Sequence, residues 1–371
     1  MTVVHRTSHP RPRARPTALL LAVGLVSLSA CAATPETAPP SADPVQRLLD
    51  EWAADGRGGA AVALARDDDE LQLAVAGTDG PDGGALDVGA PFRVGSLSKT
   101  FVSVMLLQLV ADGTVGLDDL VVDHAPDLTI ADGLTVRQLL AHRSGIPEHT
   151  DSELAPAVLA DTGRTWTPGE VLDLVADQPR DFAPDEEFAY SNTNYVVTGL
   201  LLEAVTGLSL ADNLQARIAD PLDLSSTWFA PDDDRAPVGG FSRSLPGGDT
   251  DGASYRALET AAGAAGALVS TTAALATFLR ALAHGDLLPA EVYAEMTQGF
   301  PDAGWSLGIF PADPPTATGI SNGGAIPGFA AYMQYDPATE DLLVVLVNDD
   351  TRSSEPLTAA LVELLDADTD G

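Results

Sequence analysis

The order of apolar and polar residues along the chain predicts strands near both ends and helices between them. Short runs of branched and small apolar residues are typical of strands, and apolar residues spaced three and four apart are typical of helices. The strand-like runs cover 60–65, 71–76, 305–309, 329–335 and 342–347. The helical periods cover 45–52, 136–141, 168–176, 194–205, 210–218, 271–283 and 356–365. This order predicts an α/β (α+β) fold: one antiparallel sheet from N- and C-terminal segments, flanked by helices, with an inserted all-helical lobe.

One further helix should be buried on nearly every face. Residues 96–111 are apolar at most positions, and Asp112 and Gly113 end them with a typical C-cap signal. A helix of this kind belongs in the centre of a core. Its first turn should therefore face the interior of the protein.

The N-terminus has the layout of a secretory signal. Residues 1–16 contain four arginines and no acid, and the apolar stretch at 17–28 is too short to span a bilayer. The segment 28–31, Leu-Ser-Ala-Cys, resembles the lipobox of bacterial lipoproteins. Cys31 is the only cysteine of the chain, so it has no partner for an internal disulfide. We expect removal of 1–30 and lipidation of Cys31; the alternative is a cleaved secretory peptide with an incidental cysteine.

The rest of the chain divides into a tether and a folded domain. The segment 31–44 is rich in proline and lacks large apolar residues, which predicts an extended tether. In the domain at 45–371, the α/β part should cover about 45–104 and 256–371, and the helical lobe about 105–255. We therefore expect an extracytoplasmic domain that its lipid anchors to the cell membrane.

The charge of the chain limits its partners. The formal net charge is −35, from 19 Lys and Arg residues against 54 Asp and Glu residues. Such a charge repels polyanions, so nucleic acid is excluded as a partner. The six histidines show no metal-ligand spacing, and we expect no metal and no other cofactor. We expect a monomer that binds a small-molecule or peptide substrate.

The single lysine of the chain, Lys99, lies three residues after Ser96. Positions i and i+3 of a helix share a face, so the amine and the hydroxyl should be neighbours. Burial lowers the pKa of a lysine because the charged form is desolvated, and a neutral amine can accept the serine proton. The helix N-terminus also favours developing negative charge. The pair predicts a serine nucleophile with its base in reach; the alternative is a structural buried lysine.

Two later segments carry groups that are useful in acyl transfer. Tyr190 could relay a proton, and the Asn192 amide could bind a substrate carbonyl. The glycine-rich segment 321–329 allows a ligand to approach the backbone closely. Taken alone, each is better explained structurally, as a core tyrosine, a capping asparagine and a tight turn.

A second serine has to be weighed as a nucleophile. The segment 304–308 matches the Gly-x-Ser-x-Gly elbow of α/β-hydrolases, with Ser306 at its centre. That mechanism needs a later histidine, and none follows His284. The proline-rich residues after the segment also cannot continue as the required helix. Ser306 is therefore not expected to be catalytic.

The three segments together resemble the motifs of the penicillin-recognising serine hydrolases, the family of class C β-lactamases, D-alanyl-D-alanine carboxypeptidases and related esterases. The likeness covers nearly all of the mature chain and implies a β-lactamase/transpeptidase-like fold. Further matching segments are 139–147, 190–207, 221–224, 266–271 and 327–329.

The resemblance implies a role for each of the candidate residues. Ser96 is implied to be the acylated nucleophile, with Lys99 and Tyr190 as the general acid/base pair. Asn192 is implied to contact the substrate amide. His142 is implied to have a structural role.

The third motif departs from the family pattern. The resemblance implies an oxyanion hole made by the backbone amides of Ser96 and Ala325, and it places Gly324 and Asn322 beside the substrate on the same strand. The family usually has lysine or histidine at the position of Asn322, and asparagine carries no positive charge. A substrate carboxylate would lose its partner there. This disfavours strong β-lactamase activity and favours an ester or an uncharged amide.

The sequence thus predicts an extracytoplasmic serine hydrolase that forms an acyl-enzyme on Ser96. Its substrate would contain an ester or amide bond, in a peptide or β-lactam-like compound. Two alternatives stay open. One is a penicillin-binding wall sensor with slow turnover, which its deacylation rate would reveal. The other is a catalytically inactive binding domain, which would not react with esters.

Overall fold

The computed structural model describes residues 43–366, apart from 67–69, 82, 234, 246–248, 251–254, 300–303 and 313–318. The described residues belong to one unit of the fold, Ser41–Gly371. The predicted signal at 1–30, Cys31 and the tether up to residue 42 lie outside the described residues.

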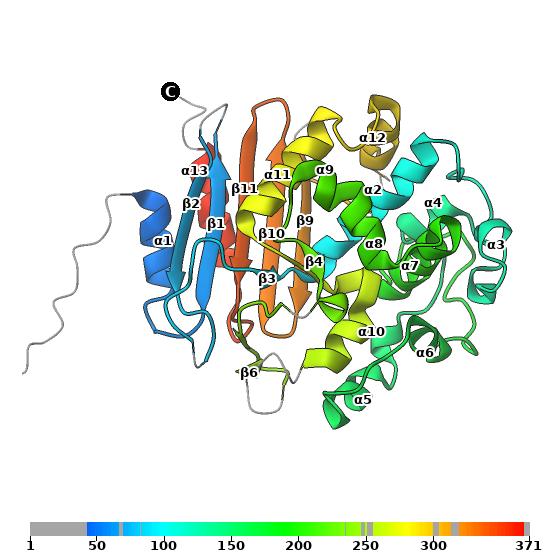
Figure 1. Cartoon of the computed structure of the whole chain (residues 1–371), viewed down its shortest axis with the longest axis horizontal. Coiled ribbons are helices and arrows are strands. Elements are labelled where there is room, and N and C mark those ends of the chain that lie inside the picture. The colour runs from blue at the N-terminus through cyan, green and yellow to red at the C-terminus, as the bar shows by residue number, and fades with distance from the viewer. Residues whose placement is uncertain are drawn as a thin grey trace, which may run out of the picture. The chain divides into compact units, whose positions relative to one another are not determined.

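A large antiparallel sheet is built from both ends of the chain, which confirms the predicted fold (Figure 1). In the described part of the chain it has six strands, in the order β2-β1-β11-β10-β9-β8. Their bounds are Gln72–Gly77 (β2), Gly59–Ala65 (β1), Asp341–Val347 (β11), Phe329–Asp336 (β10), Ile320–Ile326 (β9) and Phe310–Pro311 (β8). Val62 of β1 lies opposite Val345 of β11, so the first and last strands of the sequence meet in its centre.

Successive residues of β1 enter two separate apolar cores, because side chains alternate across a sheet. Ala61 packs in the larger core, whereas its neighbour Val62 packs in the smaller one. The helices α1 (Pro44–Trp52) and α13 (Glu355–Asp366) cover the face with the smaller core. The helix α11 (Thr272–His284) crosses the opposite face, over β1, β10 and β11 (Figure 1). The apolar strands are therefore covered on both sides.

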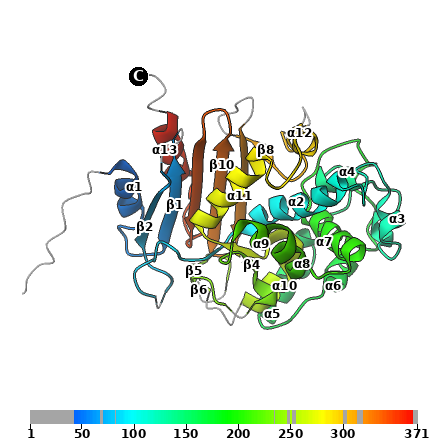
Figure 2. The same cartoon turned by 45° about the horizontal axis from the view of Figure 1, so that its top comes forward.

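The middle of the chain is mostly helical and lies beyond the β8 edge of the sheet in both views (Figure 2). The α2 helix (Ser98–Ala111) runs through its centre and is buried along most of its length, as predicted. The other helices are α3 (Val121–His124), α4 (Val136–Leu140), α5 (Leu154–Ala160), α6 (Pro168–Asp173), α7 (Asn192–Thr206), α8 (Leu210–Leu214), α9 (Asp220–Leu222), α10 (Arg256–Gly266) and α12 (Ala290–Thr297).

Short elements join these helices to the sheet. A small sheet has the order β3-β7-β4 and holds the strand before Ser96 against the segment after α10. The bounds are Phe92–Arg93 (β3), Leu268–Ser270 (β7), Trp228–Phe229 (β4), Gly240–Phe241 (β5) and Asp249–Thr250 (β6). The short helical turns are η1 (Gly95–Leu97), η2 (Thr129–Ala131), η3 (His149–Asp151), η4 (Gln215–Ala219) and η5 (Ala230–Asp232).

The predicted strand at 305–309 is wrong. Gly304 and Gly308 have φ angles of +68° and +95°, so the chain turns at both ends of this segment. Trp305 is fully buried, and its Nε1 donates to the Leu140 carbonyl at 3.0 Å. The apolar residues are therefore buried as a loop packed on the helices rather than as a strand of the sheet.

None of the described helices is, by itself, long and apolar enough to cross a membrane. The helix α7 and the segment Leu210–Leu222 reach the required length and composition only when they are taken together, and a bend of 77° separates them.

Candidate active site

Ser96 lies in the tight turn η1 that precedes α2. Gly95 has a φ of +52°, and a Cβ atom there would lie only 2.7 Å from the backbone oxygen of Ala325. Glycine is thus needed for β9 to approach the turn so closely. The Ser98 hydroxyl donates to the Gly95 carbonyl at 2.6 Å and accepts from the Leu268 amide at 3.0 Å. The position of Ser96 is therefore set by strands distant in sequence.

Lys99 is fully buried one turn after Ser96. Its Nζ lies 3.0 Å from Ser96 Oγ, 2.8 Å from Asn192 Oδ1 and 2.7 Å from the Ala265 carbonyl oxygen. Burial lowers the pKa of Lys99 from 10.5 to about 7, and the carboxylate of Glu148 partly opposes this shift. A large fraction of Lys99 is therefore neutral near pH 7 and can accept the Ser96 proton.

Tyr190 approaches the nucleophile from the other side. Its hydroxyl donates to Ser96 Oγ at 2.8 Å. Although 37 % of the residue is exposed, burial of the ring raises the pKa of Tyr190 to about 12, so the phenol stays protonated. The ring packs on His142 with a centroid distance of 4.4 Å. Of the implied acid/base pair, Lys99 is thus suited to be the base and Tyr190 the proton donor.

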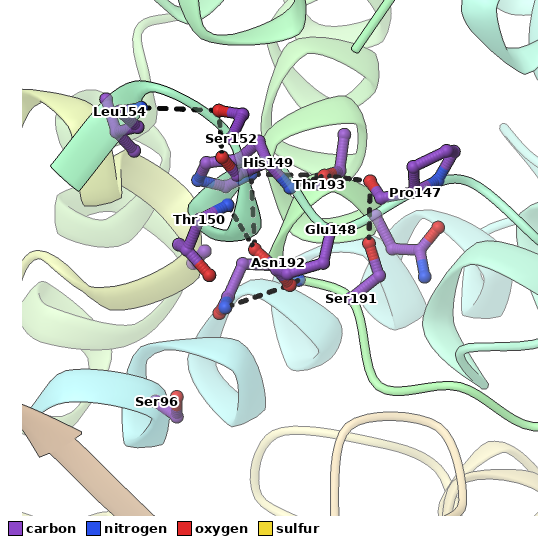
Figure 3. A network of polar contacts seen from close by, with 12 residues as sticks. Ser96, Pro147, Glu148, His149, Thr150, Ser152, Leu154, Ser191, Asn192 and Thr193 are labelled. Atoms are coloured by element: carbon purple, nitrogen blue, oxygen red, sulfur yellow. Dashed lines mark hydrogen bonds and ion pairs between the residues drawn. The ribbon is translucent and has the colours of Figure 1, made fainter. Parts of the chain in front are cut away.

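Asn192, the first residue of α7, links Lys99 to a carboxylate that the sequence analysis missed. Its Oδ1 accepts from Lys99 Nζ. Its Nδ2 donates to Glu148 Oε2 at 3.1 Å, as Figure 3 shows. The Asn192 backbone amide donates to the same Glu148 oxygen. The available signal was that Glu148 directly follows Pro147, the last residue of a matching family segment. No spacing rule relates Glu148 to Asn192.

The Ala265 carbonyl reaches Lys99 at the end of a broken helix. The sequence analysis did not predict α10, and inside it Gly263 has a φ of +43° and a ψ of −129°. This non-helical residue redirects the chain, and two residues later the Ala265 oxygen accepts from Lys99 Nζ. The break thus supplies a backbone acceptor for the buried amine.

The β9 strand presses its backbone against the Ser96 turn. A Cβ atom on Gly324 would lie 2.0 Å from the Val94 oxygen and 3.1 Å from the Ser96 amide nitrogen. Ala325 follows directly and is exposed beside Ser96. The structure thereby brings together the two backbone segments that the family resemblance assigns to an oxyanion hole.

Asn322 does not reach the substrate side of β9, so its implied role as a substrate contact is wrong in this structure. The residue is 1 % exposed, and its Nδ2 donates to Thr100 Oγ1 at 2.8 Å. Its Oδ1 accepts from the Gly323 amide at 2.8 Å, and Thr100 donates onward to the Gly308 carbonyl. Its side chain therefore joins β9 to α2 inside the core.

A pocket of about 160 Å³ opens at Ser96. None of its described lining residues is Lys, Arg, Asp or Glu, and most of its wall is apolar. A larger cavity, of about 270 Å³, lies across α10 and is lined by neither Ser96 nor Lys99. The lining of the smaller pocket is Ser96, His149, Thr150, Leu154, Asn192, Leu258, Ala261, Ala262, Ala265, Gly266, Ala325, Ile326 and Pro327.

The second serine weighed as a nucleophile, Ser306, is not placed for catalysis. Ser306 is 2 % exposed, and its hydroxyl donates to the Gln298 carbonyl at 2.8 Å, so it does not face a pocket as a nucleophile would. Among the described residues, no group of three or more His, Cys, Asp or Glu side chains could hold a metal ion.

Comparisons with known proteins give a consistent result. A family model described as Beta-lactamase matches residues 45–367. The chain is 32% identical over 181 residues to penicillin-binding protein 4 of Amycolatopsis lactamdurans, a match that covers 47% of this chain and 45% of that relative. The chain thus matches less than half of that relative's length.

Two solved structures align over most of this chain. A D-stereospecific amidohydrolase from Streptomyces sp. has 30% identity and a TM-score of 0.74, over 85% of this chain and 97% of that chain. A D-amino acid amidase from Ochrobactrum anthropi SV3, complexed with L-phenylalanine amide, has 28% identity and a TM-score of 0.75, over 88% of this chain and 97% of that chain.

Proposed function

The chain belongs to the beta-lactamase family, and from this premise we propose that it is a serine hydrolase that cleaves amide or ester bonds through an acyl-enzyme on Ser96. One observation carries the proposal: Lys99 Nζ and Tyr190 Oη both lie within hydrogen-bonding distance of Ser96 Oγ, at 3.0 and 2.8 Å. A neutral amine and a protonated phenol on one hydroxyl provide a base and an acid for acyl transfer.

The proposed reaction has two halves. Neutral Lys99 takes the hydroxyl proton while Ser96 Oγ bonds to the substrate carbonyl carbon, and the carbonyl electron pair moves to the oxygen between the amides of Ser96 and Ala325. Collapse of this intermediate breaks the bond to the leaving group, which takes a proton from Tyr190; Lys99 returns a proton to Tyr190. A water molecule then gives a proton to the same pair and bonds to the acyl carbon. The bond from this carbon to Ser96 Oγ breaks, and the pair returns the proton to Oγ.

We propose an amino-acid amide that lacks a free carboxylate and has an apolar side chain as the substrate. The described pocket lining offers no cation, Lys99 is buried and Asn322 is neutral, so the carboxylate of a β-lactam or D-alanyl peptide would stay unpaired. The apolar wall, with Leu154 and Leu258, suits an apolar side chain. The two solved relatives are named as amidohydrolase and amidase, which supports the amide class.

We further propose that the mature protein is a monomer outside the cytoplasm, anchored by a lipid on Cys31 after loss of 1–30, with no nucleic-acid partner. The support is the sequence layout and the net charge of −35. Metabolic labelling with an alkyne fatty acid tests the anchor. The wild type should be labelled and sediment with membranes, and Cys31→Ser should do neither.

Mass spectrometry of the full chain tests the reaction. Wild type and Ser96→Ala are incubated with a fluorophosphonate, a penicillin and nitrophenyl acetate, and ammonia release is followed with D- and L-phenylalanine amide. A single fluorophosphonate adduct that is absent from Ser96→Ala, together with amide turnover, supports the proposal. A lasting penicillin adduct without turnover would favour the wall sensor. No adduct with any reagent would favour the inactive binding domain.

A further inference from the structure

Glu148 is held in one orientation beside the catalytic groups. Its side chain is 16 % exposed. One carboxylate oxygen accepts from the backbone and the side-chain amide of Asn192, and the other accepts from the Thr150 amide at 2.9 Å (Figure 3). Three N–H donors on two chain segments therefore fix this carboxylate.

The carboxylate decides which way the Asn192 amide faces. An asparagine side chain can turn either its oxygen or its NH₂ group toward a neighbour, but a carboxylate only accepts hydrogen bonds. The NH₂ group must therefore face Glu148. The Asn192 oxygen is then left to face Lys99, as observed at 2.8 Å.

The direction of the Lys99 lone pair follows from this orientation. A neutral amine has two N–H donors and one lone pair. Asn192 Oδ1 and the Ala265 carbonyl oxygen each take one N–H, at 2.8 and 2.7 Å. Ser96 Oγ, at 3.0 Å, is the remaining neighbour, so the lone pair points at it and can accept its hydroxyl proton. An Asn192 amide turned the other way would offer a donor to Lys99 and so compete with Ser96 for this lone pair.

We propose that Glu148 is a positioning residue, which orients the Asn192 amide and thereby aims the basic lone pair of Lys99 at Ser96. This role rests on the proposed hydrolase function. Glu148 touches neither Ser96 nor the reacting bond in this arrangement; it acts through Asn192 and through its negative charge.

The charge of Glu148 adds a second effect that can be measured separately. The titratable groups facing Lys99 are Glu148, His142, His149, Tyr190 and Tyr195. Burial lowers the pKa of both histidines and raises the pKa of both tyrosines, so all four are neutral near pH 7. The Glu148 carboxylate thus opposes the desolvation of the Lys99 ammonium.

Because Lys99 is the only lysine of the chain, its titration can be read without assignment. The full chain is labelled with carbon-13 lysine, and the single Cε resonance is followed against pH in the wild type, Glu148→Gln and Glu148→Asp. Glu153→Gln is the control, because it removes the same charge from an exposed position of the same segment. We expect Glu148→Gln to lower the pKa of Lys99 by about one unit, and Glu148→Asp and the control to leave it nearly unchanged.

Kinetics on the same proteins test the positioning role. We expect kcat for nitrophenyl acetate to fall about tenfold or more in both Glu148→Gln and Glu148→Asp, with KM changed less than threefold. Adding Glu148→Gln to Asn192→Ala should cause no further loss of kcat, because Glu148 acts through Asn192. Thermal melting of each variant identifies any that fail to fold, and Glu148→Asp then replaces Glu148→Gln in this comparison.

Two results would overturn the positioning role. One is a kcat within twofold of the wild type in both Glu148 variants. The other is a double variant whose loss of kcat equals the product of the losses measured for the Glu148 variant and for Asn192→Ala alone. An unshifted Lys99 resonance in Glu148→Gln would overturn the effect of charge. Absence of fluorophosphonate labelling in the wild type would instead refute the proposed function, and the titration would still decide whether Glu148 controls the proton on Lys99.

Discussion

Replacing Gly324 by alanine should disable catalysis while leaving the fold intact. The added Cβ would lie 2.0 Å from the Val94 oxygen and 3.1 Å from the Ser96 amide nitrogen. Real Cβ atoms essentially never approach another heavy atom within 3.0 Å, so β9 must retreat from the turn by roughly 1 Å. Ala325 is the next residue of β9 and would move with it.

The size of the effect follows from the proposed oxyanion hole. The amides of Ser96 and Ala325 must lie about 3 Å from one oxygen atom, and loss of one such donor costs on the order of 10²–10³ in kcat. We therefore expect kcat to fall by about 10²-fold in Gly324→Ala. The overpacking should also cost about 1–3 kcal/mol in the free energy of unfolding, which a domain of this size can tolerate.

The adjacent Gly323 provides a matched control. A Cβ atom there would have no neighbour within 4 Å, so Gly323→Ala makes the same chemical change on the same strand without a clash. Steady-state hydrolysis of nitrophenyl acetate and the rate of Ser96 labelling are measured for both variants, beside urea unfolding. If Gly324→Ala keeps kcat within twofold of Gly323→Ala, β9 does not form the oxyanion hole and the reasoning is wrong.

Three other predictions concern Lys99 and the core. The kcat/KM value should rise about tenfold per pH unit up to about pH 7 and then level off, because only the neutral form of Lys99 accepts a proton; a profile that climbs steadily to pH 10 would contradict this. Lys99→Met should abolish acylation yet raise the free energy of unfolding at pH 7 by about 2 kcal/mol, measured by urea unfolding, because a buried ammonium is removed. Since the pKa of Lys99 is lower in the folded state, this advantage should shrink as pH rises from 7 to 10.5, and an advantage independent of pH would refute it. Phe278→Ala should lower the free energy of unfolding by about 3–5 kcal/mol, because its ring stacks on that of Phe101 inside the core, with the ring centroids 3.7 Å apart. A loss below about 1 kcal/mol would argue against this packing.

Local patterns in the sequence were sufficient to predict the main helices and strands of the fold. The strands β1, β10 and β11 were predicted from short apolar runs, and the buried helix α2 from a longer segment that is apolar at most positions and ends in a C-cap signal. The pairing of Ser96 with Lys99 was also predictable, since a separation of three residues brings two side chains together through the backbone of one helical turn. In both cases the information lies within a few residues of sequence.

The remaining features depend on contacts that no local pattern contains. Trp305 lies in a loop rather than a strand because glycines turn the chain on both sides of it, and an apolar run by itself does not distinguish a buried loop from a strand. Asn322 occupies a motif position, but its side chain lies in the core, where its amide donates a hydrogen bond to Thr100 of α2.

The acceptors around Lys99 likewise come from distant parts of the chain. The sequence by itself determined a nucleophile and a base, Ser96 and Lys99, because both lie on one helical turn. Only the tertiary structure brought Ala265, Asn192 and Glu148 to that base, from segments 49 to 166 residues away along the chain. The pKa of a buried amine depends on its desolvation, and the direction of its lone pair depends on the groups around it in space. Both conditions arise only once the chain has folded.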